Sequence, residues 1–543
     1  MNRLRRVPAP TALPFAAGAV ALAIGCYQLS LPNVLTGVLG WNEGYDDGVY
    51  NGVAIRLVHG VLPYRDFVFV HPPGIAYLLS PFALIGLAAG SQTTMELARV
   101  LTVIVTACNP VLAGLLVRRA GTAAIVISSF SLAVWPLTVS VDRAVELEPF
   151  LVFFCLLAAI VMFRDDRPSP RRLVVAGVLL GCAFVVKVWG VLPIVAATLV
   201  WLPRWRRELA WLAAGVAAAI VVLCLPLALP APGAFFHDVI VDQLSRQNTF
   251  AATPFADRLL TIFGLPGITA FQVPAWIGVG GFAVLLLGVF TLFGWKWRNR
   301  TRLEWFLLML AAVTFVGTFD APVLFDHYAY FPAALGAPLL GVVAGRGLSS
   351  GISLLGRRRL SPSSGGTLRR LTHGPVAAVA LVGMVLAAVL VQQDTTYAAR
   401  YLSEASNVSG IDGVIPAGAC VISDYPPDLI AANRFSPSKP GCPAVVDPYG
   451  MFLADDGGTQ PHLSPPSFQF PFVEQWFEAL QRADYVDLRI PYSDFIPWVP
   501  YMITWFSQNY SLVAHLATTY PASGYIDTFK AEYIYERIPS PSG

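Results

Sequence analysis

Charged residues are scarce in this sequence. Asp, Glu, Lys and Arg make up 13% of its 543 residues, against roughly 25% in an average soluble protein. Hydrophobic residues make up 56%, and the mean hydropathy is +0.62. So few charges cannot cover that much apolar surface in water, and disordered, collagen-like and coiled-coil chains have different compositions. The composition therefore predicts a polytopic membrane protein.

Several motifs of soluble enzymes are also missing. The chain has no Gly-rich phosphate loop, no His-Glu-x-x-His and no nucleophile elbow. None of its seven cysteines has metal-ligand spacing. Five of them fall in apolar runs, whereas Cys420 and Cys442 lie in the polar C-terminal part. These two could form a disulfide if that part is extracytoplasmic.

The basic residues gather in clusters between apolar runs. The clusters are Arg3/Arg5/Arg6, Arg118/Arg119, Arg164 to Arg172, Arg204 to Arg207, Lys296 to Arg302, and Arg357 to Arg359 with Arg369/Arg370. A nucleic-acid-binding protein would need them on one surface, whereas the positive-inside rule explains them as cytoplasmic loops. We therefore expect a multi-pass protein of the plasma (inner) membrane with a cytoplasmic N-terminus.

About eleven apolar runs can span a membrane, some of them only within a bundle. They are residues 13–31, 97–117, 121–140, 149–163, 173–187, 188–202, 209–229, 274–293, 304–319, 331–346 and 375–391. A further run, 73–89, is short and broken by Pro81, and counting it would place Arg118 and Arg119 outside. We expect it to lie at the membrane surface or half-inserted. The odd number of spans predicts an extracytoplasmic C-terminus.

This topology divides the chain into two expected domains. Residues 1–395 form a transmembrane domain with surface helices in 32–96, and residues 396–543 form a small extracytoplasmic α/β domain. The Ser-, Gly- and Arg-rich stretch 347–374 is expected to be a cytoplasmic linker. The tail contains one expected amphipathic helix and two expected strands: Val473 to Ala483, Gly418 to Asp424 and Tyr485 to Ile490.

The first outer loop holds two adjacent carboxylates, Asp46 and Asp47. Residues 50–59 continue as an amphipathic helix, which would hold the pair against the membrane face. A carboxylate fixed there can act as a general base on a sugar or peptide hydroxyl. A solvated loop end and an ordinary Asp-Asp-Gly turn are the alternatives that need no function.

Three basic side chains follow in the same loop: Arg56, Arg65 and His71. A phosphate carried by a lipid would meet them at the headgroup level, where guanidinium groups and protonated imidazoles bind phosphate oxygens. The alternatives are a structural helix cap for His71 and a solvated ion pair with Asp66 for Arg65.

The second outer loop, only about eight residues long, is dense in acids: Asp142, Glu146 and Glu148. Its position on the same face as Asp46 and Asp47 favours a second carboxylate of one site. The alternative is a solvated loop in which Asp142 pairs with the neighbouring arginine.

Polar residues also stand at two other outer boundaries. Lys187 lies where two apolar runs meet, and a lysine in such a place is either functional or extends its amine to the interface. Asp326, His327 and Tyr328 cluster at the mouth of another outer loop.

The order of these motifs resembles a known superfamily. An acidic loop after the first span is followed by His-Pro-Pro-Gly opening an apolar surface helix, and then by an acidic loop ending in Glu-Pro. Gly-x-Ala-Phe-x-x-Lys and His-Tyr-x-x-Phe-Pro come next. Over about residues 10–395 this resembles the GT-C superfamily of polytopic glycosyltransferases, notably the bacterial branch akin to aminoarabinose transferases and protein O-mannosyltransferases.

The resemblance implies inverting transfer of a hexosyl or pentosyl group on the outer face, from a polyprenyl-phosphate-linked donor to an envelope glycan, lipid or protein acceptor. Asp46 or Asp47 matches the first-loop acid, the candidate base. Lys187 matches a family lysine, and His71 falls where relatives often keep a basic residue against the lipid phosphate. The second-loop acid is matched by Glu146, Glu148 or Asp142. Some relatives bind a divalent cation, so the cofactor is left open.

Two further expectations concern the substrates. A hydrophobic groove beside the surface helix would hold the isoprenoid chain, and the outer α/β domain would help to position the acceptor. The alternative functions are a transporter or flippase of a lipid-linked saccharide and a membrane scaffold or receptor. Transporters commonly have internal repeats and ionisable residues near the midplane, whereas here no repeat is visible and the acids lie at the outer boundary.

Overall fold

The computed structural model describes most of the chain. The described residues are 11–31, 34–39, 41–135, 137–138, 141–165, 168–202, 205–245, 255–263, 300–359, 410–456, 470–489, 492, 495–517 and 531–539. The predicted spans 274–293 and 375–391 lie outside them, as does the predicted domain boundary at residue 395.

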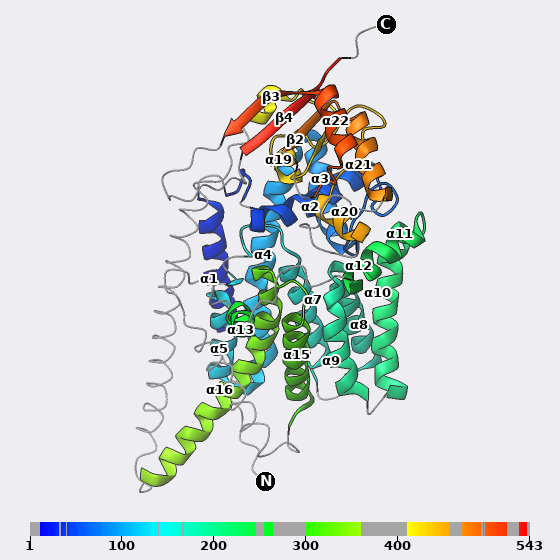
Figure 1. The fold of residues 1–543 in the computed structure, drawn as a ribbon. Helices are drawn as coiled ribbons and strands as arrows, with labels where there is room; N and C mark the ends of the chain where they lie inside the picture. Colours follow the sequence, from blue (N-terminus) through cyan, green and yellow to red (C-terminus); the bar gives the residue numbers. More distant parts are fainter. Residues whose placement is uncertain are drawn as a thin grey trace.

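Long apolar helices form a bundle, seen side by side in Figure 1. They are α1 (Ala12–Leu29), α4 (Ser91–Val117), α5 (Thr122–Ala133), α7 (Leu147–Met162), α8 (Pro170–Val186), α9 (Val191–Trp201), α10 (Ala210–Ala228), α15 (Arg302–Phe319) and α16 (Tyr330–Arg359). Each overlaps one predicted span. By length and composition, five described segments can cross a membrane: Ala12–Leu29, Ser91–Ala120, Arg207–Ala228, Arg302–Phe319 and Asp326–Arg346.

Small residues let the bundle helices approach closely. A Cβ at Gly177 of α8 would collide with the backbone of α10 at Leu212, and a Cβ at Gly215 of α10 would collide with Val174. Close backbone approach at small residues is the usual way apolar helices associate where water does not drive them together. The prediction for 347–374 is partly wrong, because α16 remains helical up to Arg359 instead of ending near residue 346.

Short elements connect the bundle helices. They are η1 (Arg118–Ala120), η2 (Val188–Gly190), η4 (Trp205–Leu209), α11 (Pro232–Phe236), η5 (His237–Val241), α12 (Asp242–Ser245), α13 (Phe255–Ile262) and η7 (Asp326–Ala329). Basic helix ends meet at the end of the bundle away from the C-terminal region. There Arg119 donates to the backbone carbonyl of Arg164, and Arg302 pairs with Glu208 at 3.5 Å.

Two helices lie at the opposite end, beneath the C-terminal region: α2 (Trp41–Val58) and α3 (Gly74–Ala89). Helix α3 coincides with the run expected to be a surface helix. Helix α2 begins earlier than expected, at Trp41 instead of residue 50, so that Asp46 and Asp47 lie inside a helix and not in a loop.

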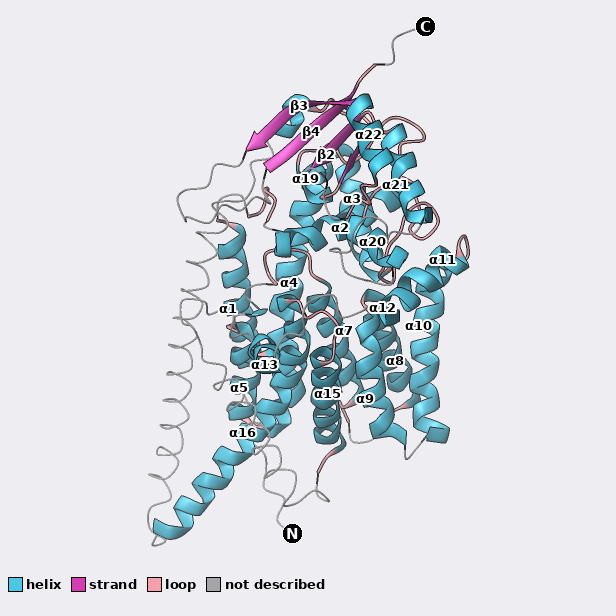
Figure 2. Ribbon diagram, in the orientation of Figure 1, coloured by secondary structure: helices cyan, strands magenta, loops and turns pink. Residues whose placement is uncertain are grey.

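The C-terminal region contains the strands, as Figure 2 shows. Its elements are α18 (Ile411–Val414), β1 (Val421–Ser423), α19 (Pro426–Ala431), α20 (Pro448–Asp456), α21 (Phe470–Arg482), β2 (Tyr485–Leu488), α22 (Pro500–Asn509), β3 (Tyr510–Ala517) and β4 (Ala531–Arg537). The sheet order is β1-β2-β4-β3, with β1 and β2 parallel and the other pairs antiparallel. The predicted strands and amphipathic helix of the tail are confirmed as β1, β2 and α21, and Cys420 and Cys442 form a disulfide.

The C-terminal region packs directly on α2 and α4. A Cβ at Gly48 of α2 would collide with the ring of Pro427, so that only glycine permits this approach of α2 to α19. The hydroxyl of Ser91 at the start of α4 donates to the carbonyl of Ile430 at 2.8 Å. These contacts hold α2 between the bundle and the sheet.

Candidate active site

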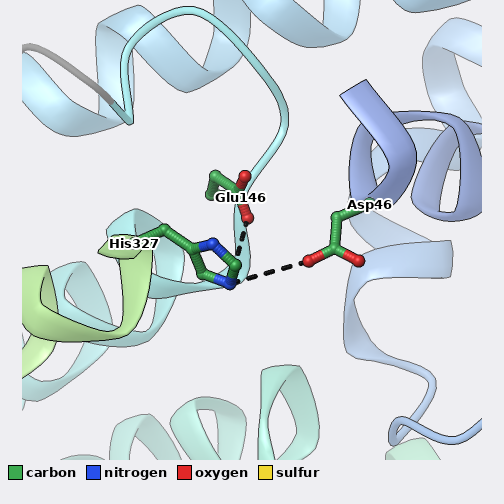
Figure 3. Close-up of side chains that lie close together, drawn as sticks. All are labelled: Asp46, Glu146 and His327. Atoms are coloured by element: carbon green, nitrogen blue, oxygen red, sulfur yellow. Dashed lines mark ion pairs between the residues drawn. The ribbon is translucent and has the colours of Figure 1, made fainter. Parts of the chain in front are cut away.

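Three predicted site residues meet at the end of the bundle that faces the C-terminal region. The Nε2 of His327 lies 3.6 Å from Oδ2 of Asp46 and 3.8 Å from Oε2 of Glu146. Figure 3 shows the two carboxylates converging on the imidazole from different segments of the chain. We call Asp46, Glu146 and His327 the triad cluster. Its members are 100 or more residues apart in sequence, so that only the fold brings them together.

Each member lies at the start of a helix or within a helical turn. Glu146 is the extended residue that precedes α7, with φ −110° and ψ 152°, and His327 lies in the single turn η7 that leads into α16. Asp46 lies in the second turn of α2. Its side chain is 30% exposed, against 4% for Glu146 and 12% for His327. Asp46 is therefore the carboxylate that a substrate can reach.

The two adjacent aspartates point to different faces of α2, because successive residues of a helix are about 100° apart. Asp47 is fully buried, and its Oδ2 accepts from Arg99 at 2.6 and 3.0 Å. Its Oδ1 accepts from the backbone N–H of Val145 and from the amide of Asn51, each at 3.1 Å. Asp47 thus ties α2 to α4 and to the second loop, which is a structural role.

Lys187 lies beside the triad cluster, among the side chains of Glu148, Trp189 and Tyr328. We call these four residues the Lys187 box. The ammonium of Lys187 pairs with the fully buried Glu148, 3.9 Å above the ring of Tyr328 and 4.7 Å from that of Trp189. Tyr328 in turn contacts His327, with 4.7 Å between the ring centroids. The predicted residues Lys187, Glu148 and Tyr328 therefore adjoin the cluster, and they place a cation at its edge.

Burial affects the acids of the cluster. It raises the pKa of Asp46, with the charges of His327 and Lys187 opposing it, although partial exposure of this side chain lessens the effect. Burial, followed by the charges of Asp46 and Glu148, raises the pKa of Glu146 well above its usual range. The two carboxylates are therefore costly to ionise together unless a cation or a substrate group lies between them.

Asp46, Glu146 and His327 also suit a divalent cation. One ligand atom from each lies within 4.8 Å of the others, and Oε2 of Glu146 is buried without a hydrogen-bond partner among the described residues. A second such group is His237, Asp238 and Asp242, where the exposed His237 lies 3.3 Å from Asp242.

The C-terminal region holds the turn of α2 that carries Asp46. The hydroxyl of Tyr45 donates to Asp447 at 2.9 Å and accepts from the backbone N–H of Tyr449 at 2.6 Å. The Tyr45 ring also packs against Tyr425 and Phe495, at 5.8 and 5.9 Å between centroids. Sequence reasoning missed this contact, because Tyr45 and Asp447 are 402 residues apart and neither belongs to a motif.

Known proteins resemble this chain in sequence and in fold. The family model of dolichyl-phosphate-mannose-protein mannosyltransferases matches residues 70–230. ArnT from Cupriavidus metallidurans bound to undecaprenyl phosphate superimposes with a TM-score of 0.54 at 15% identity, over 98% of this chain and 100% of that chain. The chain has the GT-C fold. The predicted resemblance is supported by the family model over residues 70–230 and by the shared fold over the chain.

An archaeal GT-C structure is similar to the same extent. The oligosaccharyltransferase of Archaeoglobus fulgidus, tethered with an acceptor peptide, has a TM-score of 0.54 at 14% identity, over 97% of this chain and 76% of that chain. The same archaeal enzyme, AglB, in complex with an inhibitory peptide and a dolichol-phosphate, has a TM-score of 0.51. No curated protein is similar enough in sequence to match.

Three other predicted site residues are not members of the triad cluster. Arg65 is 47% exposed and pairs with Asp66 at 2.7 Å, the local ion pair that was the alternative. Asp142 is buried, with Oδ2 3.3 Å from where a Cβ of Gly25 in α1 would stand. Asp326 is exposed at the start of η7.

Two basic residues of the first loop have different surroundings. His71 is buried, with its Nε2 3.5 Å from the hydroxyl of Tyr50, one turn along α2 from Asp46. It therefore lies near the cluster, behind Tyr50. Arg56, on the contrary, packs on the ring of Phe435 in the C-terminal region.

An apolar cavity of about 370 Å³ opens between α5, α13, α15 and α16. Its walls include Leu132, Trp135, Phe263, Phe315 and Pro332. Pro332 is four residues after Tyr328 in the chain, so that one wall of the cavity begins about one turn from the Lys187 box. This cavity is not the groove expected beside the surface helix, because α3 contributes none of its walls.

Proposed function

We propose that this protein is a membrane glycosyltransferase that transfers a sugar from a polyprenyl-phosphate donor to an envelope glycan, lipid or protein acceptor. The observation that carries the proposal is the triad cluster, where a reachable carboxylate meets a histidine and a second acid beside a buried lysine. The GT-C fold, and the lipid phosphates bound by ArnT and AglB, support a donor of this class.

The donor is proposed to bind with its phosphate at the Lys187 box and its isoprenoid chain in the apolar cavity. The ammonium of Lys187 supplies the positive charge that a phosphate needs. The cavity between α5, α15 and α16 offers aliphatic and aromatic walls within the bundle, where a chain of isoprene units is stabilised by contact with apolar side chains.

In the proposed reaction, Asp46 acts as the general base. An acceptor hydroxyl oxygen bonds to the anomeric carbon while the bond from that carbon to the donor's phosphate oxygen breaks. The hydroxyl proton moves to the Asp46 carboxylate, and the bonding electron pair leaves with the phosphate. Attack opposite to the leaving group inverts the anomeric centre. General-base help of this kind contributes about 10²- to 10⁴-fold in rate.

A divalent cation is a proposed cofactor, held by Asp46, Glu146 and His327. When bound, it would stabilise negative charge on the leaving phosphate. The residues themselves orient the base: His327 lies between the two acids, and Glu148 holds Lys187 at the edge of the cluster.

We further propose that the site faces the outside of the inner membrane, with the N-terminus in the cytoplasm. The basic helix ends lie at the opposite end of the bundle, in agreement with the positive-inside rule. The disulfide Cys420–Cys442 in the C-terminal region is of the kind that persists in oxidising compartments. On this proposal residues 1–395 form the catalytic membrane domain, and residues 396–543 form an outer domain that positions the acceptor.

The experiment is a donor panel. The purified full chain, in lipid vesicles, is incubated with radiolabelled polyprenyl-phosphate sugars and an envelope extract as the source of acceptor. We expect one donor to be consumed, with the label appearing in a water-insoluble or macromolecular product, and D46N to abolish this transfer. R65Q is the matched control, because its exposed side chain lies apart from the cluster.

A different outcome would favour the alternative function. If no donor is consumed but the protein moves a labelled lipid-linked saccharide between leaflets, the chain is a flippase and the proposal is wrong. Repeating the incubation with a chelator tests the cofactor separately: unchanged transfer would remove the divalent cation from the mechanism and leave the base assignment standing.

A further inference from the structure

The glycines of helix α16 have two kinds of surroundings. A Cβ at Gly341 would lie 2.5 Å from the carbonyl oxygen of Ala124 in α5, and a Cβ at Gly345 would lie 3.2 Å from atoms of the same residue. These two glycines allow α16 to approach α5 closely. At Gly336, on the contrary, no atom of the described residues lies within 4 Å of where a Cβ would stand. Contact with another described helix therefore does not account for this glycine.

Gly336 lies on the wall of the apolar cavity of about 370 Å³. The residues of α16 that line this cavity are Pro332, Ala333, Gly336, Ala337, Leu339 and Leu340. Positions 332, 336 and 340 are four residues apart, so that they follow one face of the helix, and Gly336 is at the middle of this face. A side chain at position 336 would therefore extend into the cavity. Ala334 and Leu335, which do not line it, are fully buried.

The cavity extends along α16 from the neighbourhood of the Lys187 box into the bundle. Between Pro332 and Leu340 the helix rises by about 12 Å, and Gly336 is halfway along this distance. Pro332 is about one turn from Tyr328, which belongs to the Lys187 box. A lipid whose phosphate binds at the box would therefore have the start of its chain beside Pro332 and later units beside Gly336.

A glycine at this place has a cost and a benefit. Within a helix, glycine is less stable than alanine, because its backbone is freer in the unfolded chain. The benefit is width: an isoprenoid chain carries a methyl branch on each unit, so that it needs a wider passage than a straight acyl chain. A missing side chain supplies that width against the backbone of α16, and the small residues Ala312 and Ala333 of the same walls add to it.

We propose that Gly336 determines which lipid can carry the donor sugar, because its missing side chain leaves room for the isoprenoid chain to pass along α16. This inference rests on the proposed function, which places the donor's phosphate at the Lys187 box and its chain in the cavity. Gly336 selects by the length and width of the chain and takes no part in the transfer itself. A side chain at this position would exclude long chains, whereas a donor with a single isoprene unit would end before it.

The test compares the wild type with G336F, in which an aromatic ring fills the middle of the cavity. Full chains in lipid vesicles receive the sugar that the wild type transfers, carried on undecaprenyl phosphate or on the phosphate of a single isoprene unit. G336F should raise KM for the undecaprenyl donor about tenfold or more, since lost burial of two methylene groups weakens binding by that factor. Its kcat should hardly change. With the one-unit donor the two proteins should have equal kcat/KM. Equal KM values for the undecaprenyl donor would overturn the proposal.

Two variants control for effects on the fold. V222F adds the same ring to α10 at a side chain that is 67% exposed, and it should behave like the wild type. G336A adds only a methyl group, so that it should keep the wild-type KM and unfold at a slightly higher temperature. Pro338 interrupts the hydrogen bonds of α16 two residues later. If Gly336 serves the bend at this proline instead, G336A will unfold at a lower temperature, which would contradict the proposal. G336L replaces G336F if that variant does not fold.

Binding without transfer separates this proposal from the proposed function. Undecaprenyl phosphate should raise the unfolding midpoint of the wild type, G336A and V222F, but not that of G336F. If it does so while the wild type transfers no sugar, the proposed function is wrong and the role of Gly336 stands. If the wild type transfers sugar and all four proteins are stabilised equally, the role of Gly336 is wrong and the proposed function stands. Hexadecyl phosphate, which has a straight chain, should stabilise the wild type less; equal stabilisation would show a general acyl-chain site and overturn the selection of isoprenoids.

Discussion

Two groups of buried acids lie at the same end of this protein, and they differ in what surrounds them. In the triad cluster two carboxylates face a histidine, and Asp46 remains 30% exposed. In the C-terminal sheet four acids surround Arg489, and each is at most 4% exposed. They are Asp424, Asp428, Asp487 and Glu532.

Arg489 organises the second group, which we call the sheet cluster. Its guanidinium pairs with Asp428 at 2.7 and 2.8 Å and lies 3.5 Å above the ring of Tyr425. Its backbone N–H donates to Asp424 at 3.0 Å. The acids of the sheet cluster are 0 to 4% exposed, whereas the side chain of Asp46 is 30% exposed. Buried acids alone therefore do not mark an active site here; a buried acid that a substrate can reach does.

The largest expected effect is in the triad cluster, from D46N. The substitution keeps the shape of the side chain but removes the base, so that the transfer rate should fall about 10²- to 10⁴-fold. The unfolding midpoint should hardly change, because Asp46 is partly exposed. The rate with a saturating donor and the thermal midpoint are measured together. A rate within a few fold of the wild type would remove Asp46 from the mechanism.

The neighbouring substitution D47N should act on stability. It removes the anion that faces the buried Arg99, and breaking a buried pair in this way costs about 3–5 kcal/mol. We expect a lower yield of folded protein and a lower unfolding midpoint. If D47N instead folds like the wild type and is inactive, then Asp47 is the base and Asp46 has the structural role.

A smaller effect is expected where the C-terminal region holds α2. Y45F removes the hydroxyl that donates to Asp447 and accepts from Tyr449, which leaves a buried carboxylate short of one donor and costs about 1–3 kcal/mol. Because Asp46 is the next residue, kcat should fall several-fold with KM for the donor little changed. A change in the unfolding midpoint alone, with kcat intact, would show that this contact only stabilises the fold.

The smallest effect is expected in the sheet cluster, and it has the opposite sign. Burial, followed by the charges of Asp428 and Asp424, raises the pKa of Asp487 well above its usual range. A carboxyl whose pKa is higher in the folded state destabilises the fold when it is ionised, above that raised pKa, and the loss is recovered as the pH falls toward the unfolded pKa. D487N should therefore unfold a few degrees higher than the wild type near neutral pH.

The pH dependence gives the control for this variant. The advantage of D487N over the wild type should shrink as the pH is lowered. The wild-type carboxyl no longer destabilises the fold once it is protonated in the unfolded state as well as in the folded state. Thermal midpoints over a range from weakly alkaline to weakly acidic pH measure the advantage. A difference that stays constant with pH would show that the substitution acts through packing and not through charge.

Hydropathy predicted the helices well, because a spanning helix needs a long apolar run wherever it lies. It could not assign Asp46 and Asp47, since their roles depend on α2 beginning at Trp41 and on the rotation between successive residues of a helix. Helix α3 was predicted, but the apolar cavity was not, because its walls come from segments far apart in sequence. In the tail β1 and β2 were predicted, whereas β3 and β4 were not.

The partners of site residues were the least predictable feature. Lys187 and Glu148 could be named as candidates from their places beside apolar runs, but not as a pair. Arg99 lies within an apolar span and was not considered, although it fixes Asp47. Such contacts depend on the packing of helices, which spacing in one sequence does not reveal.

On the proposed function, the triad cluster and the Lys187 box receive a lipid phosphate. An experimental density map of the full chain with undecaprenyl phosphate tests it most directly. We expect phosphate density beside Lys187 and His327, with the isoprenoid chain entering the cavity between α5, α15 and α16. Phosphate density at the basic end of the bundle, with the triad cluster unoccupied, would contradict it.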